Sequence, residues 1–146
     1  MSSDPAAGPT HADLIREAAA YLNPVEISGR LFGNVAAIAE TPDGRHFPGV
    51  CIDTPCGTGF CAEAAAIAAM VTAGEQRIAR IVAVWRDPST ERLHVLPPCG
   101  RCRLFISQVH AYNLHRTRVI LGDQEAAVLA DLIPRHECPS PLDSPF

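Results

Sequence analysis

The sequence contains no lysine, and its positive charge is correspondingly modest. All 12 basic residues are arginine, and 16 acidic residues outnumber them, which gives a formal net charge of −4 at pH 7. Binding to nucleic acids depends mainly on basic side chains that neutralise phosphates. A polynucleotide partner is therefore not expected.

The sequence also has no hydrophobic run long enough to cross a membrane. Its longest apolar run, residues 64–72, is about half of the ~20 residues that span a bilayer. The chain does not open with a basic segment followed by an apolar one, as a secretory signal does. We expect a cytoplasmic protein with no membrane partner, in which the six cysteines are thiols or metal ligands rather than disulfides.

The length and composition fit one globular domain. A chain of 146 residues falls within the range of roughly 100–200 residues that is common for a domain. The contents of 47% hydrophobic and 19% charged residues are typical of a folded core. We expect residues 1–146 to form a single domain, with loose ends at about 1–9 and 139–146, where Pro, Ser, Ala, Gly and Asp dominate.

Apolar spacing and turn residues predict alternating helices and strands. A first helix is expected to begin after Thr10 and to end before Pro24. Residues 31–40 and 46–52 predict a hairpin, because the turn between them contains Pro and Gly. The remaining expected elements are helices over 61–71, 98–109 and 124–133 and strands over 78–85 and 118–121. This order predicts an α/β fold with a mixed sheet covered by helices on both faces.

Three cysteines at the starts of two predicted helices are the most informative feature. Cys61 opens the first of these helices, and Cys99 and Cys102 lie at the start of the second. Three positions apart on a helical turn, Cys99 and Cys102 share a face and can chelate one ion. A helix N-terminus stabilises the thiolate form that metals bind. The sequence therefore predicts a zinc ion on these three sulfurs, with the fourth tetrahedral position left open for water.

Glu63 follows Cys61 by two positions and is placed to exchange a proton with that water rather than to bind the metal. Zinc with three thiolates carries a formal charge of about −1. Arg101 and Arg103 are candidates to compensate this charge; the alternative is that they are solvated charges on the helix surface.

Two alternatives to a three-thiolate catalytic site stay open. Cys56 is a candidate fourth thiolate of a closed structural site, and the Cys-x-x-Cys pair alone fits a thiol–disulfide oxidoreductase.

With these residues, the sequence resembles the zinc-dependent cytidine deaminase family, and within it looks most like the blasticidin S deaminases. The resemblance covers roughly residues 11–137. It implies a three-layer α/β/α sandwich, a homotetramer, and hydrolysis of a cytosine nucleoside or nucleoside analogue to the uracil form with release of ammonia. It places Cys61, Cys99 and Cys102 on the zinc ligands and Glu63 on the proton shuttle. The matching segments are residues 43–50 (Asp-Gly-Arg-His-Phe-Pro-Gly-Val), 61–63 (Cys-Ala-Glu), 98–103 (Pro-Cys-Gly-Arg-Cys-Arg) and 132–134 (Leu-Ile-Pro).

The sequence departs from the family where the substrate is held. The family's ribose motif, Gly-x-Asn-x-Glu-Asn, stands here as residues 49–54 (Gly-Val-Cys-Ile-Asp-Thr). The resemblance thus places substrate contacts on Cys51 and Asp53, with Ala62 beside the first zinc ligand. The family's Phe near the base falls on Gly33 when no gap is allowed, and Phe32, one position away, is the candidate for its role. A thiol is a weak hydrogen-bonding group, so we expect little discrimination between cytidine and deoxycytidine. A non-catalytic nucleoside-binding or structural-zinc protein of the same fold is the alternative, and Glu63 argues against it.

Overall fold

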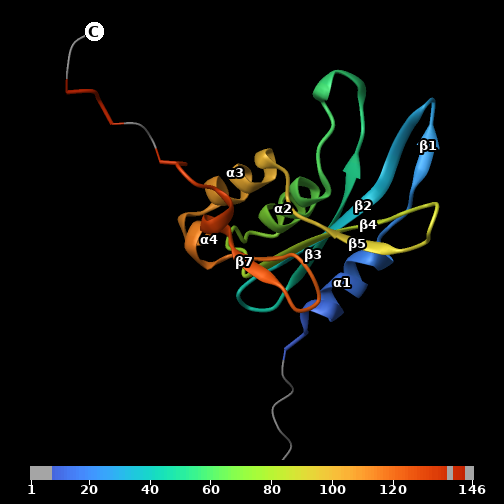
Figure 1. The fold of residues 1–146 in the computed structure, drawn as a ribbon, viewed down its shortest axis with the longest axis horizontal. Coiled ribbons are helices and arrows are strands. Elements are labelled where there is room, and N and C mark those ends of the chain that lie inside the picture. The colour runs from blue at the N-terminus through green and yellow to red at the C-terminus, as the bar shows by residue number, and fades with distance from the viewer. Residues whose placement is uncertain (1–7, 138–139, 144–146) are drawn as a thin grey trace, which may run out of the picture.

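A seven-stranded sheet forms the middle layer of the protein (Figure 1). The computed structural model describes residues 8–137 and 140–143, so most of the expected loose ends lie outside the described residues. Strands β4 and β6 pair in parallel and all other pairs are antiparallel, so the sheet is mixed, as predicted. The strands are β1 (Val25–Ile27), β2 (Arg30–Glu40), β3 (His46–Ile52), β4 (Arg80–Arg86), β5 (Leu93–Leu96), β6 (Arg118–Ile120) and β7 (Ala126–Val128).

Helices cover both faces of this sheet. Helix α1 (His11–Ala20) buries Leu14 and Ala18 against one face. Helix α2 (Ala62–Thr72) buries an almost purely aliphatic set against the other face, together with Ile106 of α3 (Gly100–Val109). Helix α4 (Ala111–Arg116) and the short 3₁₀ segments η1 (Pro55–Gly57) and η2 (Leu129–Leu132) complete the chain. The predicted three-layer α/β/α fold is confirmed.

A glycine in β3 sets how closely α2 approaches the sheet. A Cβ atom at Gly49 would lie 2.2 Å from the backbone nitrogen of Ala66 and 2.6 Å from the carbonyl oxygen of Ala62. A side chain at this position would therefore push the helix away from the strand. Because α2 begins at the candidate site, this close contact fixes where the first turn of the helix lies.

The predicted helix over residues 124–133 is wrong. Ala126–Val128 form β7 instead, which pairs antiparallel with β6 through Val119 and Ala127. The segment is short and apolar, and such runs fit a strand and a helix equally well. Pairing with β6 decides the outcome, because it satisfies the hydrogen-bonding groups of the β6 backbone.

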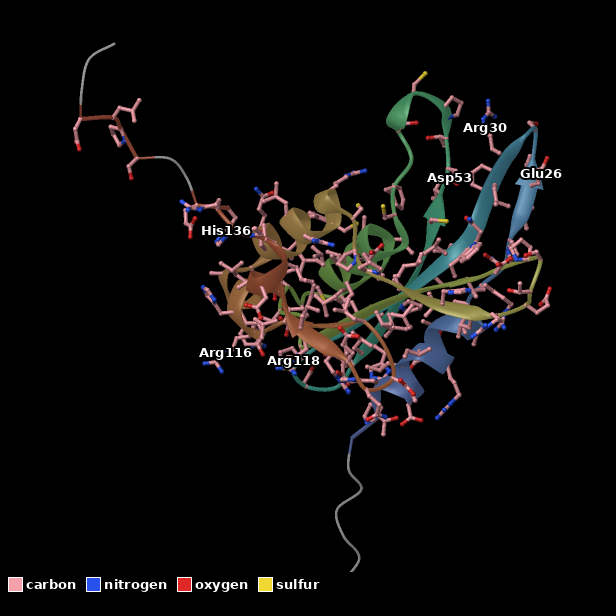
Figure 2. The ribbon with its side chains drawn as sticks, viewed as in Figure 1. Glu26, Arg30, Asp53, Arg116, Arg118 and His136 are labelled. Atoms are coloured by element: carbon pink, nitrogen blue, oxygen red, sulfur yellow. The ribbon has the colours of Figure 1, made fainter. Side chains whose placement is uncertain are left out.

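The sequence analysis also did not predict strands β1 and β5 or helix α4. The β1–β2 hairpin projects from the sheet with Glu26 and Arg30 at its exposed end (Figure 2).

Within the part of the chain that the structure describes, no helix combines the length and apolar character needed to span a bilayer.

A polar network joins three strands to α1 at the end of the sheet away from the β1–β2 hairpin. The Glu40 carboxylate is buried and accepts hydrogen bonds from Arg80 of β4, one of them 2.7 Å long from Nη2. His46 of β3 lies 3.3 Å from Glu40 and 2.6 Å from Glu17 of α1. Burial alone raises the pKa of Glu40, but Arg80 and His46 outweigh it and hold that pKa below its ordinary value.

Glu40 should consequently stabilise the fold in a pH-dependent way. Since its folded-state pKa lies below the ordinary value of 4.5, the contribution is complete above that pH and is lost as the pH falls through the folded pKa. We expect Glu40→Gln to lower the free energy of unfolding by about 2 kcal/mol at pH 7. The loss should shrink steadily toward pH 3. Urea unfolding across this range measures it, and a difference independent of pH would contradict the assignment.

Candidate metal centre and active site

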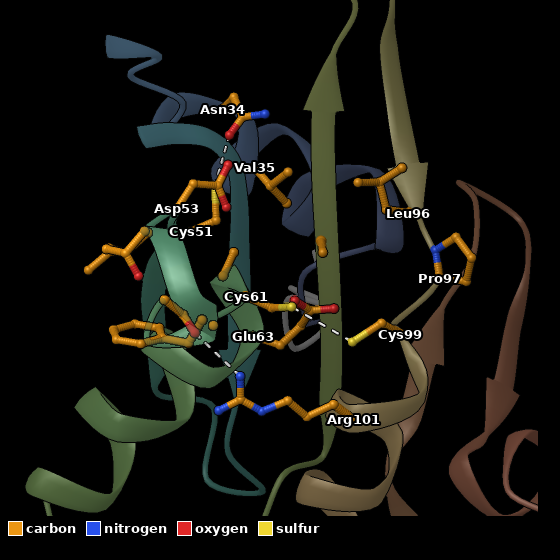
Figure 3. Close-up of a pocket in the computed structure, with 17 residues that line it drawn as sticks. Asn34, Val35, Cys51, Asp53, Cys61, Glu63, Leu96, Pro97, Cys99 and Arg101 are labelled. Carbon is orange, nitrogen blue, oxygen red and sulfur yellow. Dashed lines mark hydrogen bonds between the residues drawn. The ribbon is translucent and has the colours of Figure 1, made fainter. Parts of the chain in front are cut away.

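A cavity of about 400 Å³ opens where the first turns of α2 and α3 meet the ends of β2 and β3 (Figure 3). Its floor carries Cys61, Glu63 and Cys99, and Arg101 lies at its side. The two helices place these groups because each one begins with a cysteine: Cys61 is the N-cap residue of α2 and Cys99 that of α3. The positive ends of two helix dipoles therefore converge on one point, which favours negative charge there.

The three predicted ligands come together in the structure. The sulfur atoms of Cys61, Cys99 and Cys102 all lie within 4.8 Å of one another, and those of Cys61 and Cys99 are 3.7 Å apart. Tetrahedral zinc with Zn–S bonds of about 2.3 Å separates two sulfur ligands by about 3.8 Å. Neither N-cap thiol makes a capping hydrogen bond to its helix, so both sulfurs are available as ligands. The residues present thus fit a thiophilic metal ion.

Ionisation of these three thiols requires a positive ion nearby. Burial raises the pKa of Cys102 far above its ordinary value, and the nearby Glu63 and Cys61 raise it further. Burial and the neighbouring Cys99 likewise raise the pKa of Cys61. Burial acts in the same direction on Cys99, but hydrogen bonds from Cys102 outweigh it and lower its pKa. Three thiolates beside a carboxylate are therefore unfavourable without a compensating positive ion, which metal binding would supply.

Glu63 lies in the first turn of α2, with only 5% of its surface exposed. Burial raises its pKa, and this effect outweighs its hydrogen bonds to the helix backbone and to the Cys102 thiol. A carboxyl group that lines a cavity and has a raised pKa is suited to take up and release protons. The structure places it in the same cavity as the Cys61 and Cys99 thiols, and its role as proton carrier stays a prediction.

The two alternative uses of cysteine gain no support. Cys56 lies exposed in η1, in a left-handed backbone conformation with φ of 63°. Among the described His, Cys, Asp and Glu residues, only Cys61, Cys99 and Cys102 form a cluster of metal-ligating geometry, so Cys56 does not close a four-thiolate site. The five described cysteines are free. A third thiol 3.7 Å from Cys99 is typical of a metal site rather than of an isolated dithiol pair.

The predicted substrate contacts are divided between cavity and surroundings. Cys51, Asp53 and Ala62 line the cavity. Asp53 is exposed, and together with Arg30 it also lines a second hollow; Figure 2 labels both residues. Phe32 is not among the residues that line the cavity; it pairs with Ile52 in the sheet.

The two arginines beside the ligands lie in different environments. Arg101 lines the cavity and donates a 3.4 Å hydrogen bond to the carbonyl of Gly59. Arg103 donates instead to the carbonyls of Pro98 at 2.8 Å and Leu132 at 3.2 Å, so it ties the start of α3 to η2. Charge compensation by either residue stays a prediction.

The sequence reasoning missed Asn34 and Phe60, which also line the cavity. Simple alternation along β2 places Asn34 on the face covered by α1, because Ala36 and Ile38 pack there. The signal that was available is Gly33, since an isolated glycine inside a strand pattern indicates a bulge. Phe60 precedes Cys61 directly and carried no signal of its own.

We predict that the purified protein carries about one thiophilic metal ion per chain, bound through sulfur alone. Replacing Cys99 and Cys102 together by alanine removes two of three ligands and should abolish metal retention. Cys56→Ala is the matched control and should retain the metal, because Cys56 lies outside the thiol cluster. Elemental analysis and X-ray absorption measure both. A nitrogen ligand, or full retention in the double variant, would refute the site.

Solved structures similar to this chain include bacterial cytidine deaminases. No family model matches the sequence. The cytidine deaminase from Burkholderia pseudomallei is 26% identical, with 87% of this chain and 98% of that chain covered and a TM-score of 0.66. The enzyme from Mycobacterium tuberculosis is 27% identical, with coverages of 86% and 92% and a TM-score of 0.62. That from Bacillus anthracis, at 20% identity, coverages of 86% and 88% and a TM-score of 0.68, supports the fold alone. The chain therefore has the fold of the bacterial cytidine deaminases.

Proposed function

We propose that this protein is a zinc-dependent hydrolase that converts a cytosine nucleoside or nucleoside analogue to the uracil form and releases ammonia. The observation that carries this proposal is a cluster of three thiols, two of which, Cys61 and Cys99, line one cavity together with the buried Glu63. The fold shared with cytidine deaminases supports the same chemistry. Cys61, Cys99 and Cys102 would hold the zinc ion. When bound, zinc supplies Lewis acidity, which makes water a nucleophile near neutral pH.

Glu63 performs the proton transfers of this reaction. It accepts a proton from the attacking water as the new C–O bond forms at C4 of the cytosine ring, and it delivers that proton to N3. It then transfers the second proton of the water to the amino group. The C4–N bond breaks, ammonia leaves, and the C4 oxygen becomes the carbonyl of uracil. Its raised pKa suits both directions of transfer, because the group must bind and release a proton in each turnover.

The cavity is matched to a small molecule. Its volume of about 400 Å³ lies in the range of roughly 300–1,000 Å³ that ligand sites occupy. Among the described residues only one basic side chain, Arg101, lines it. We therefore expect a free nucleoside rather than a nucleotide or a polynucleotide as the substrate. Blasticidin S is our candidate substrate among sugar-modified analogues.

We place the protein in the cytoplasm, where its thiols stay reduced.

A non-catalytic protein of the same fold is the competing proposal. A closed structural zinc site needs a fourth protein ligand, and the described cluster offers three. Burying an ionisable carboxyl group beside three thiols costs folding free energy. Proton transfer during catalysis gives a reason for that cost, whereas a structural site gives none.

Glu63→Gln separates binding from chemistry. The change removes the proton carrier but preserves the volume of the side chain, so we expect the metal and the fold to be retained and the rate of ammonia release to fall by about 10²–10⁴-fold. Glu26→Gln, on the exposed β1 strand, is the matched control and should leave the rate unchanged. Ammonia release from a panel of cytosine nucleosides and analogues measures both. A near-normal rate in Glu63→Gln would assign the proton transfer to another group.

We also expect a homotetramer. Helix α2 is almost entirely aliphatic, and Val71 is 42% exposed on it, while Leu104 and Phe105 of α3 are 43% and 37% exposed. Apolar groups on the outer sides of two neighbouring helices are typical of subunit contacts. Light scattering at micromolar concentration should give four times the chain mass, and Val71→Asp should lower it. A monodisperse wild-type monomer would contradict this expectation.

A further inference from the structure

Strand β2 is irregular directly beside the cavity. Phe32 pairs with Ile52 and Ala36 pairs with Val50, so the three residues 33–35 oppose the single residue Cys51. Gly33 permits this bulge because its φ is +68°, a conformation that residues with a side chain rarely adopt. A Cβ atom at Gly33 would also lie 1.9 Å from Oδ1 of Asn23. The irregularity is therefore built into the sequence at this glycine.

The bulge turns Asn34 into the cavity. Neighbouring residues of a regular strand point to opposite faces of the sheet. Here Asn34 and Val35 both line the cavity, whereas the next residue, Ala36, packs toward α1. Figure 3 shows Asn34 above Cys51, at the end of the cavity away from the thiol cluster, and Asp53 lines the same cavity. A β-bulge commonly redirects a side chain toward a functional site in this way.

The hydrogen bonds of Asn34 leave its amide group able to donate. Its Oδ1 atom accepts a hydrogen bond from the Cys51 thiol, with an S···O distance of 2.9 Å. That contact orients the amide, and within the described chain its Nδ2 atom donates to no protein group. The Asp53 carboxylate, which lines the same cavity, is exposed and can only accept when ionised. The cavity thus offers a hydrogen-bond donor from Asn34 and an acceptor from Asp53.

We propose that Asn34 is a specificity-determining residue that, together with Asp53, binds the hydroxyl groups of the substrate's sugar. A hydroxyl group both accepts and donates, so an amide N–H and a carboxylate that line the same cavity are complementary to the hydroxyl groups of a sugar. This inference rests on the proposed deaminase function, and it reverses the expectation of weak sugar discrimination, which considered residues 51 and 53 without Asn34. It also favours cytidine over blasticidin S as the substrate, because the sugar of blasticidin S lacks the 2′- and 3′-hydroxyl groups. A site built to bind a hydroxyl group discriminates steeply against substrates that lack it.

The test compares three substrates that share the cytosine ring: cytidine, 2′-deoxycytidine and 2′,3′-dideoxycytidine. For the wild-type protein, kcat/KM should fall by roughly tenfold or more from cytidine to dideoxycytidine. Asn34→Asp keeps the shape of the side chain and the oxygen that accepts from Cys51, but it replaces the donor with a second acceptor. Asn34→Ala removes the whole amide. Both variants should lower kcat/KM for cytidine by roughly tenfold and leave the value for dideoxycytidine almost unchanged.

The ratio of the two kcat/KM values distinguishes recognition from a structural effect, because a disturbed fold slows all substrates alike. Gln108→Ala, which removes an exposed amide on α3, is the control and should keep the wild-type ratio. If the wild-type protein deaminates these nucleosides but the Asn34 variants keep its ratio, the role of Asn34 is refuted and the proposed function stands. If the metal-loaded wild-type protein deaminates no cytosine nucleoside, the proposed function fails, and this inference fails with it.

Discussion

The convergence of two helix N-termini on three sulfur atoms is the constraint on which the rest of the site depends. Cys61 and Cys99 cap α2 and α3, so each thiol lies where the backbone N–H groups of a helix are unpaired and favour negative charge. The close contact at Gly49 fixes the start of α2 against the sheet, and Arg103 ties the start of α3 to η2. Since Glu63 lies in the first turn of α2, the same geometry that gathers the ligands also delivers the proton carrier.

The cavity built on this convergence has two chemically different ends. At the thiol end, buried sulfur atoms and a carboxyl group with a raised pKa suit bond cleavage by water. At the other end, Asn34 and Asp53 offer a donor and an acceptor from β2 and from the segment after β3. A nucleoside has the same division, with a heterocycle at one end and hydroxyl groups at the other. The proposed substrate class therefore follows from the whole length of the cavity, not from the metal ligands alone.

The sequence predicted those features that depend on local spacing. The helix start at Cys61 and the Cys-x-x-Cys turn at Cys99 are local signals, and both cysteines occupy the predicted N-termini. The hairpin of β2 and β3 follows from its Pro-Gly turn in the same way. Residues 124–133 are different, because whether they form a helix or pair with β6 depends on a strand edge that no local pattern describes. Asn34 was missed for a related reason: a bulge changes which face a side chain occupies, and alternation alone cannot reveal it.

The central claim is that this cavity adds water to a cytosine ring and expels ammonia. Mass spectrometry of the nucleoside after incubation of cytidine with the metal-loaded protein in oxygen-18 water tests it most directly. The account predicts a uracil nucleoside that carries one oxygen-18 atom at C4, with one equivalent of ammonia. It predicts formation of this product about 10²–10⁴-fold more slowly when Glu63 is replaced by glutamine, and none when the metal is removed. Unchanged cytidine with the fully loaded protein, or the same yield from protein stripped of metal, would contradict it.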